Sequence, residues 1–531
     1  MKQDASLNRG LARQPGVAVK PLMRLAMVFI AGMVMFGCTS APQDPLTVKT
    51  VKGAVKGTQQ DNLRVFKGIP FAKAPAGDLR WRAPQPAEPW TDVRDATSFA
   101  DACSQTIHPF MSNPGQPVSE DCLYLNVWTP ATDETEKLPV VVWIHGGGFS
   151  YGSTAMALFD GTAIAQRDVV FVSIAYRLGP LGFMSHPELS AESESGTSGN
   201  YALMDQVAGL EWVQDNIAAF GGDPSKVTIM GESAGGMSVS LMAQTPLAKG
   251  LFRGVISQSG AAAVNTGMMA SLEDAEKAGV SLMENAGAAS LAELRQLPPE
   301  AIVEAATATS GFTRSNSWPT IDGYVITMDP TALYQQGKQN DAALLIGLNE
   351  YEGALFNTIK TADEFKAMVN KRYPDTTDEV LAAYPASDDR QALESAINYN
   401  TDITFATQAW SLARLQTRHG DAPVYYYHFD QDPPARPGIP TGAIHGAELP
   451  YMFGTQHIRD IAWTQADKAM SELMITYWTN FVKTLDPSGS GVTEWPVFTE
   501  QSEQALLFEE GTARVVELPH KERMATIDPL Q

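Results

Sequence analysis

The sequence of 531 residues predicts an α/β protein built on one mostly parallel central sheet. The composition is globular, with 44% hydrophobic and 18% charged residues. Short apolar, β-branched runs recur along the chain, and helical stretches lie between several of them. Runs that are apolar on both faces are typical of parallel strands covered by helices. The predicted strands are LPVVVWI (138–144), VVFVSIAY (169–176), KVTIM (226–230), GVISQS (254–259), ALLIGL (343–348) and VYYYHF (424–429).

The intervening segments complete a single predicted domain over residues 47–531. Residues 201–220 have apolar positions at helical spacing and end at a Gly-Gly pair. Before the first predicted parallel strand, residues 48–71 alternate and contain glycine, as antiparallel edge strands do. Longer helical insertions, roughly 265–310 and 360–420, are expected to lie over the strand ends as a cap, where ligands bind in such sheets.

The N-terminus predicts export. A basic segment precedes an apolar run at residues 25–37, which is too short to span a bilayer but suits a signal peptide over 1–37. The Gly-Cys pair that follows resembles a bacterial lipoprotein processing site, so Cys38 is a candidate for lipidation and membrane attachment. Residues 38–46 would then be a tether. The alternatives are cleavage nearby with secretion, or an uncleaved anchor; translation from Met23 would give a leader of ordinary length.

Charge and cysteines limit the partners and the compartment. The net charge of −22 disfavours nucleic acid, whose phosphates an acidic surface repels. Apart from Cys38, only Cys103 and Cys122 remain, and an oxidising compartment would allow one bridge between them. Two unpaired buried thiols are the alternative.

The strand at 226–230 leads into the strongest motif, Gly231-Glu-Ser233-Ala-Gly235. A strand, a G-x-S-x-G turn and a helical stretch form the nucleophile elbow of the α/β-hydrolase fold. The glycines are needed because the turn strains the serine backbone and leaves no room for neighbouring β-carbons. Ser233 is therefore the predicted nucleophile, presented at a helix N-terminus whose dipole favours an oxyanion.

A glycine-rich loop follows the strand at 138–144. In the segment HGGGF (145–149) the glycines allow backbone N–H groups to converge on one point. We expect the amides of Gly147, Gly148 and Ala234 to form an oxyanion hole. A phosphate-binding loop would require a Gly-Lys-Ser/Thr ending, which is absent. His145 precedes the elbow, so it is expected to support the loop rather than act as the base.

The base and the acid should follow Ser233 in the order acid, then histidine. Among five later histidines, His445 lies on a glycine-flanked loop after the last predicted strand, where the base belongs; a histidine bonded to backbone is the alternative. Two glutamates, Glu350 and Glu352, follow the strand at 343–348. Local chemistry hardly separates them, and Glu352 is preferred because a glycine follows it.

Together these segments resemble the type-B carboxylesterases, a family that includes cholinesterases and bacterial para-nitrobenzyl esterases. The resemblance runs from about residue 47 to about residue 500. It rests on six ordered motifs: SEDCLYLNVWTP (119–130), HGGGF (145–149), FGGDP (220–224), GESAGG (231–236), Glu352-Gly353 and HGAELPY (445–451).

The resemblance implies the α/β-hydrolase fold and serine ester hydrolysis by the triad Ser233, Glu352 and His445. It also implies the Cys103–Cys122 disulfide. The resemblance further implies a structural ion pair between Arg80 and Glu120, and a position for Glu232 near the base.

Departures from the family limit the substrate. The 103–122 loop contains no tryptophan, and Leu355 stands where a choline-site aromatic is expected, so choline esters are disfavoured. Glu232, Leu355 and Phe356 are the candidate substrate-binding residues. We expect a neutral small or medium ester to be cleaved through an acyl-enzyme. No clustered His or Cys ligands are evident in the sequence, so no metal or cofactor is expected. A lipase and a non-catalytic cholinesterase-like binding protein are the alternatives.

Overall fold

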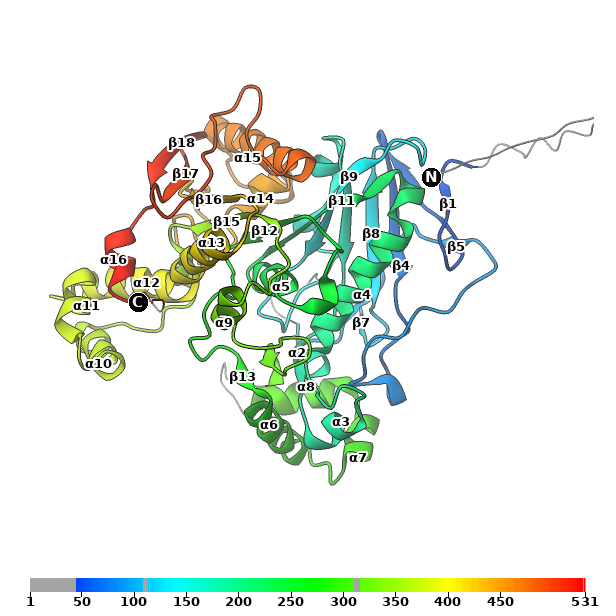
Figure 1. The fold of residues 1–531 in the computed structure, drawn as a ribbon, viewed down its shortest axis with the longest axis horizontal. Helices are drawn as coiled ribbons and strands as arrows, with labels where there is room; N and C mark the ends of the chain where they lie inside the picture. The colour runs from blue at the N-terminus through cyan, green and yellow to red at the C-terminus, as the bar shows by residue number, and fades with distance from the viewer. Residues whose placement is uncertain (1–43, 108–112, 114, 309–315, 529, 531) are drawn as a thin grey trace, which may run out of the picture. The chain divides into compact units, whose positions relative to one another are not determined.

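A mostly parallel sheet forms the centre of the protein in the computed structural model (Figure 1). In the described part of the chain it has eleven strands, in the order β18-β17-β16-β15-β12-β11-β9-β10-β8-β4-β3. All pairs from β10 to β17 are parallel, and the strands at both edges are antiparallel. The strands are β3 (Thr58–Gln60), β4 (Leu63–Pro70), β8 (Tyr124–Thr129), β9 (Leu138–Ile144), β10 (Val170–Ile174), β11 (Gly222–Glu232), β12 (Gly254–Gln258), β15 (Ala343–Asn349), β16 (Val424–Phe429), β17 (Gln504–Glu509) and β18 (Thr512–Glu517).

The structure describes residues 44–107, 113, 115–308, 316–528 and 530. From Asp44 on, these residues belong to one compact unit. The predicted signal peptide, Cys38 and most of the tether lie outside the described residues.

Each face of the sheet is buried by its own layer of helices, which explains why the central strands are apolar throughout. Along β9, Val140, Val142 and Ile144 pack in one hydrophobic cluster, whereas Val141 and Trp143 pack in the other. This alternation is the two-residue period of a strand. The first cluster includes residues of α4 (Tyr201–Asn216), α5 (Ala234–Met242) and α13 (Thr407–His419), and the second includes those of α15 (Gln465–Thr484).

Two groups of helices outside these layers form the predicted insertions. One contains α6 (Leu272–Asn285), α7 (Leu291–Gln296) and α8 (Pro299–Ala308), which lie together with α3 (Pro187–Glu192) at one end of the sheet (Figure 1). The other contains α10 (Ala362–Arg372), α11 (Thr377–Ala383) and α12 (Asp389–Thr401), beside α16 (Lys521–Ala525). The groups contact α2 (Gly179–Phe183) and η6 (Glu352–Leu355), which follow β10 and β15. They therefore cover segments that leave the carboxyl edge of the sheet.

The structure differs from the prediction in three regions of the chain. Helix α13 packs on the sheet rather than in a cap, because its apolar face joins the first core cluster. The first predicted edge strand forms a separate small sheet of β1 (Thr47–Lys49), β2 (Ala54–Lys56) and β5 (Arg94–Asp95). The C-terminal strands β17 and β18 extend the main sheet and were not predicted.

The remaining elements are short. They are β6 (Ala102–Cys103), β7 (Val118–Ser119), β13 (Ala270–Ser271), β14 (Thr320–Ile321), α1 (Thr162–Ala165), α9 (Pro330–Gln335) and α14 (Leu449–Met452).

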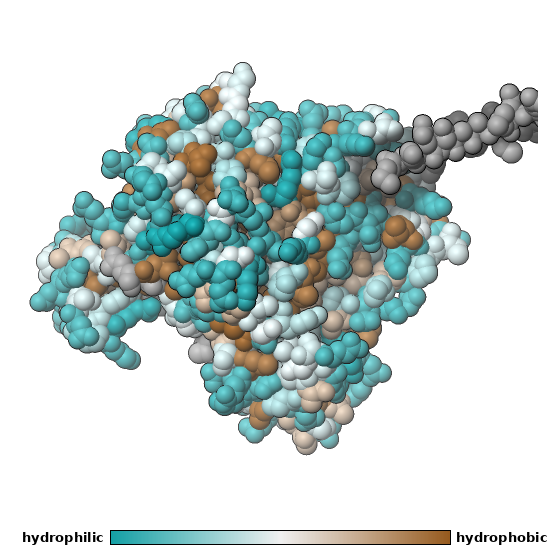
Figure 2. Space-filling view, viewed as in Figure 1, coloured by the Kyte–Doolittle hydropathy of each residue, from teal (hydrophilic) through white to brown (hydrophobic). Residues whose placement is uncertain are grey.

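The surface seen in Figure 2 is mostly hydrophilic, with hydrophobic residues in separate groups, as expected for a chain with a net charge of −22. Within the residues that the structure describes, no helix has the length and apolar character needed to cross a bilayer.

Candidate active site

Ser233 lies in a strained turn between β11 and α5. Its backbone has φ of 57° and ψ of −122°, a conformation that costs energy for a residue with a β-carbon. The flanking glycines make the turn possible: a β-carbon on Gly231 would lie 2.3 Å from the carbonyl oxygen of Gly235, and one on Gly235 would lie 2.0 Å from that of Ile144. The turn therefore has the geometry of a nucleophile elbow, with a half-buried serine at its tip.

Three side chains from distant segments form one hydrogen-bonded chain. Nε2 of His445 lies 2.8 Å from Oγ of Ser233, and Nδ1 lies 2.5 Å from Oε2 of Glu352. The backbone amide of Asn349 donates to Oε1 of Glu352 at 2.8 Å, so both carboxylate oxygens are held. The structure thus brings together the serine, histidine and acid that the sequence predicted. In this arrangement His445 can act as a base toward Ser233, while the buried carboxylate of Glu352 orients its ring.

The loops that carry the acid and the histidine are tied to each other. Tyr351 donates its amide to the carbonyl of Ala443 at 2.9 Å, and the side chain of Asn349 donates to the carbonyl of Ile444 at 2.9 Å. Glu352 is fully buried at the start of η6, immediately beyond β15. The end of one strand therefore fixes both the carboxylate and the loop of His445.

The amides of Gly147, Gly148 and Ala234 are available as donors. In the part of the chain that the structure describes, none of these three amide groups has a hydrogen-bond partner. Gly147 has φ of +110°, and a β-carbon there would lie 2.2 Å from the carbonyl oxygen of Tyr151, so only glycine fits. The loop lies against the nucleophile, since a β-carbon on its neighbour Gly146 would come within 3.0 Å of Cβ of Ser233.

His145 supports this loop instead of acting as a base. Its ring is stacked on Tyr176 with 4.5 Å between centroids, and Nδ1 lies 2.8 Å from the carbonyl oxygen of Gly146. The Tyr176 hydroxyl donates to the carbonyl of His145 at 2.7 Å. Burial lowers the pKa of His145 to about 4, so the ring is neutral at neutral pH.

Two further buried carboxylates surround His445. Oε1 of Glu232 lies 3.3 Å from Nε2 of His445, and burial raises the pKa of Glu232 to about 8. Glu448 accepts hydrogen bonds from Gln258 and Asn349, and burial raises its pKa to about 7. For His445, burial alone would lower the pKa, but the charges of Glu232 and Glu352 outweigh it and raise the pKa to about 9. The cluster therefore favours the imidazolium that forms during proton transfer.

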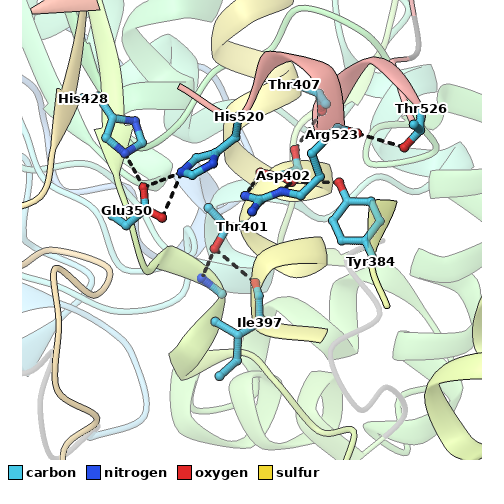
Figure 3. A network of polar contacts seen from close by, with 11 residues as sticks. Glu350, Tyr384, Ile397, Thr401, Asp402, Thr407, His428, His520, Arg523 and Thr526 are labelled. Atoms are coloured by element: carbon cyan, nitrogen blue, oxygen red, sulfur yellow. Dashed lines mark hydrogen bonds and ion pairs between the residues drawn. The ribbon is translucent and has the colours of Figure 1, made fainter. Parts of the chain in front are cut away.

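Glu350, the alternative acid, points away from this site. Its carboxylate lies 2.6 Å from Nε2 of His428 and 2.8 Å from Nε2 of His520 (Figure 3). Burial would raise the pKa of Glu350, but hydrogen bonds from the two histidines hold it well below its ordinary value. The geometry separates two glutamates that sequence reasoning left almost equivalent.

Aromatic rings line one side of His445. The ring of Phe356 lies 5.2 Å from the imidazole, and that of Phe405 lies 4.9 Å from it. Phe356 is 45% exposed and Leu355 is 46% exposed, so both candidate binding residues are accessible. Phe405, from the π-helical segment at Asp402–Ala406, was not predicted, and no motif in the sequence marks it. Glu448 was also missed, although it lies within the HGAELPY motif.

Two structural pairings expected from the family resemblance are confirmed. Cys103 and Cys122 form a disulfide. Arg80 and Glu120 form a buried bidentate ion pair, with contacts of 2.7 and 2.5 Å. Arg80 also donates to backbone carbonyls at residues 295 and 297 near the end of α7, and so joins the disulfide region to the helical insertion.

The fold and the site define a serine hydrolase of the α/β-hydrolase class. The profile of the Carboxylesterase family matches residues 44–527, and the chain belongs to that family. It is 36% identical to the para-nitrobenzyl esterase of Bacillus subtilis (strain 168), over 87% of this chain and 94% of that protein. It is 35% identical to the fumonisin B1 esterase of Sphingopyxis macrogoltabida, over 89% of each.

Solved structures agree with this assignment. A structure of PNB esterase superposes with a TM-score of 0.80 at 33% identity, covering 92% of this chain and all of the other. A thermophilic PNB esterase also gives a TM-score of 0.80 at 33% identity. The protein is therefore a carboxylic-ester hydrolase of the serine type.

Proposed function

We propose that Ser233 is the nucleophile of a two-step hydrolysis of neutral carboxylic esters. His445 takes the hydroxyl proton as Oγ attacks the ester carbonyl, and the imidazolium is stabilised by Glu352. The imidazolium then gives this proton to the departing alkoxide, which leaves an acyl-enzyme on Ser233. Water then attacks the acyl-enzyme as it loses a proton to the same imidazole, and the imidazolium gives that proton to Oγ of Ser233 as the acyl–oxygen bond breaks and the acid leaves.

One observation carries this proposal: the continuous chain from Ser233 through His445 to Glu352, at 2.8 and 2.5 Å. Three amides that have no other hydrogen-bond partner among the described residues, at Gly147, Gly148 and Ala234, support stabilisation of the tetrahedral oxyanion beside Ser233. Each such donor contributes about 3 kcal/mol to the transition state.

The surroundings of His445 favour uncharged substrates. The rings of Phe356 and Phe405 beside His445 offer apolar contact, which an uncharged ester group can fill without losing the hydration of a charge. One relative is named for para-nitrobenzyl esters and another for fumonisin B1, so the names alone do not single out one ester. We infer a small or medium neutral ester with an apolar group beside these two rings.

The test compares Ser233→Ala with Ser281→Ala, an exposed helical serine, on soluble nitrophenyl esters of increasing acyl length. We expect Ser233→Ala to lose turnover and fluorophosphonate labelling while it keeps its melting temperature, and Ser281→Ala to match the wild type. Turnover or labelling retained by Ser233→Ala would disprove the assignment. Strong activity on emulsified long-chain acylglycerols with weak activity on soluble esters would favour a lipase. A wild-type chain that neither labels nor turns over would favour a binding protein.

We also propose that the chain is exported and lipidated at Cys38. The apolar run at 25–37 supports export, and so does the Cys103–Cys122 disulfide, because such bonds persist in oxidising compartments. Mass spectrometry of the mature N-terminus is the test. A diacylated Cys38 is the expected result; an unmodified peptide that contains Cys38 together with the preceding leader would refute it.

A further inference from the structure

One glutamate and two histidines meet at the C-terminal ends of β15 and β16, in a cluster that ester hydrolysis does not use (Figure 3). Nε2 of His428 lies 2.6 Å from Oε2 of Glu350, and Nε2 of His520 lies 2.9 and 2.8 Å from its two oxygens. The side chains of His428, Glu350 and His520 are 6%, 24% and 36% exposed. Each histidine therefore points its own Nε2 atom at the carboxylate of Glu350. The cluster is open to solvent on the side of His520.

The three side chains are held in place by separate contacts. Glu350 donates its amide to the carbonyl of Phe429 at 2.9 Å, which fixes the end of β15 against β16 beside His428. His520 precedes α16, and this helix is anchored by Arg523, whose guanidinium donates to Asp402 at 2.6 and 3.1 Å. The cluster is thus preorganised by the sheet and by a buried ion pair.

We propose that Glu350, His428 and His520 bind a divalent transition-metal ion of the zinc class. Two imidazole nitrogens and a carboxylate form the donor set of three-ligand zinc sites, whereas magnesium and calcium prefer oxygen ligands alone. The three ligand atoms lie within 4.8 Å of one another. Ligand atoms of a tetrahedral zinc with bonds of about 2.1 Å lie about 3.4 Å apart. The contacts of 2.6 and 2.8 Å between Glu350 and the two histidines would therefore lengthen by about 0.6 to about 0.8 Å on binding.

His520 is partly exposed, so an ion from solvent can reach the cluster, and a water would supply the fourth ligand of a tetrahedral site. A metal here would cross-link β15, β16 and the C-terminal segment, three parts of the chain that are otherwise joined by hydrogen bonds. Glu350 lies two residues before Glu352, so the cross-link would also brace the loop that carries the acid of the triad. We therefore expect the metal to stabilise the fold while the ester chemistry stays with Ser233.

The experiment titrates Zn²⁺ into the full chain, stripped beforehand with a chelator, by calorimetry in about 150 mM NaCl, where weak binding to surface carboxylates is screened. The variants are His520→Ala, which changes the exposed ligand, and Glu350→Gln, which keeps the shape of the side chain. His457→Ala is the matched control, because His457 is exposed and its side chain forms no hydrogen bond or ion pair within the described residues. Co²⁺ absorption and the melting temperature are recorded in parallel.

We expect one zinc per chain with a Kd on the order of 1 µM, a visible absorption band of low-coordinate cobalt, and a zinc-dependent rise in melting temperature. His520→Ala and Glu350→Gln should each weaken binding by about tenfold or more and abolish the rise, while His457→Ala behaves like the wild type. Zinc binding that is equal in wild type and His520→Ala, or absent from the wild type below about 1 mM, would overturn the proposal. Because His520 is exposed, we expect His520→Ala to stay folded. A loss of zinc binding in this variant can then be assigned to the missing ligand.

Discussion

The buried carboxylate beside the nucleophile offers a direct test of the site's electrostatics. Oε1 of Glu232 lies 3.3 Å from Nε2 of His445. A full negative charge at this distance stabilises the imidazolium by about 1.3 kcal/mol at the dielectric of water and by about 5 kcal/mol at an effective dielectric of about 20. With 1.36 kcal/mol per pKa unit, the charge raises the pKa of His445 by about 1 to about 4 units.

In the variant Glu232→Gln we expect the pKa of His445 to fall by an amount at the lower end of this range, about one unit. Burial raises the pKa of Glu232 to about 8, so the carboxyl group is protonated for part of the range in which His445 titrates. The base works only as neutral imidazole, and kcat/KM therefore rises with pH through the pKa of His445. Removing the neighbouring charge lowers that pKa, so the acid limb of the profile should move down by about one pH unit.

The assay follows hydrolysis of a soluble neutral ester by pH-stat from about pH 6 to about pH 11, so that the range includes the full acid limb of the wild type. Glu300→Gln, which removes an exposed carboxylate on α8, is the control and should leave the limb in place. An acid limb that stays within about 0.2 units of the wild type in Glu232→Gln, or moves upward, would show that Glu232 does not set the charge of His445.

Three further variants test the loop, the disulfide and the ion pair. Gly147→Ala should lower kcat by about a hundredfold, because a β-carbon 2.2 Å from the carbonyl of Tyr151 displaces an oxyanion donor. Cys103→Ser with Cys122→Ser should lower the free energy of unfolding by about 3 kcal/mol, since the bridge closes a loop across 19 positions. Arg80→Ala should cost about 3 kcal/mol in urea unfolding, because it leaves the Glu120 carboxylate buried without its partner.

Each of these results has a matched comparison. Gly287→Ala, also at positive φ but with open space around it, should keep full kcat, and a normal kcat in the Gly147 variant would refute its assigned role. For the disulfide, the wild type under reducing conditions should lose the same stability as the double variant. For the ion pair, Arg82→Ala removes a more exposed arginine and should cost less than about 1 kcal/mol; an equal loss from both arginine variants would refute the argument from burial.

The features that could be predicted from the sequence, the nucleophile elbow and the central strands, each depend on a short continuous segment of the chain. The elbow depends on glycines two residues from Ser233, so its spacing alone predicts both strain and position. The central strands were found because burial on both faces demands uninterrupted apolar residues. Strand β9 matches its predicted range, and β16 does so as well.

Features that depend on how distant segments meet could not be predicted. Glu350 and Glu352 follow the same strand, and only the turn into η6 directs one carboxyl toward His445 and the other toward His428. Phe405 reaches the imidazole from a π-helical turn that has no sequence signature. Helical periodicity over residues 407–419 indicates an apolar face but does not say whether that face meets the sheet or a cap.

The carboxylates that prepare His445 for catalysis set activity and stability against each other. The pKa values of Glu232 and Glu448, about 8 and about 7, lie above the ordinary 4.5, so the folded state holds protons that the unfolded state has released. The same holds for His445, whose pKa of about 9 exceeds 6.5. The contribution of all three groups to the free energy of unfolding therefore falls as pH rises from about 5 to about 9. Catalysis gains over the same range, because deprotonation of His445 restores the base. The side-chain amides of Gln258 and Asn349 each donate to the carboxylate of Glu448, and these bonds offset part of the cost of its buried charge when the base is neutral.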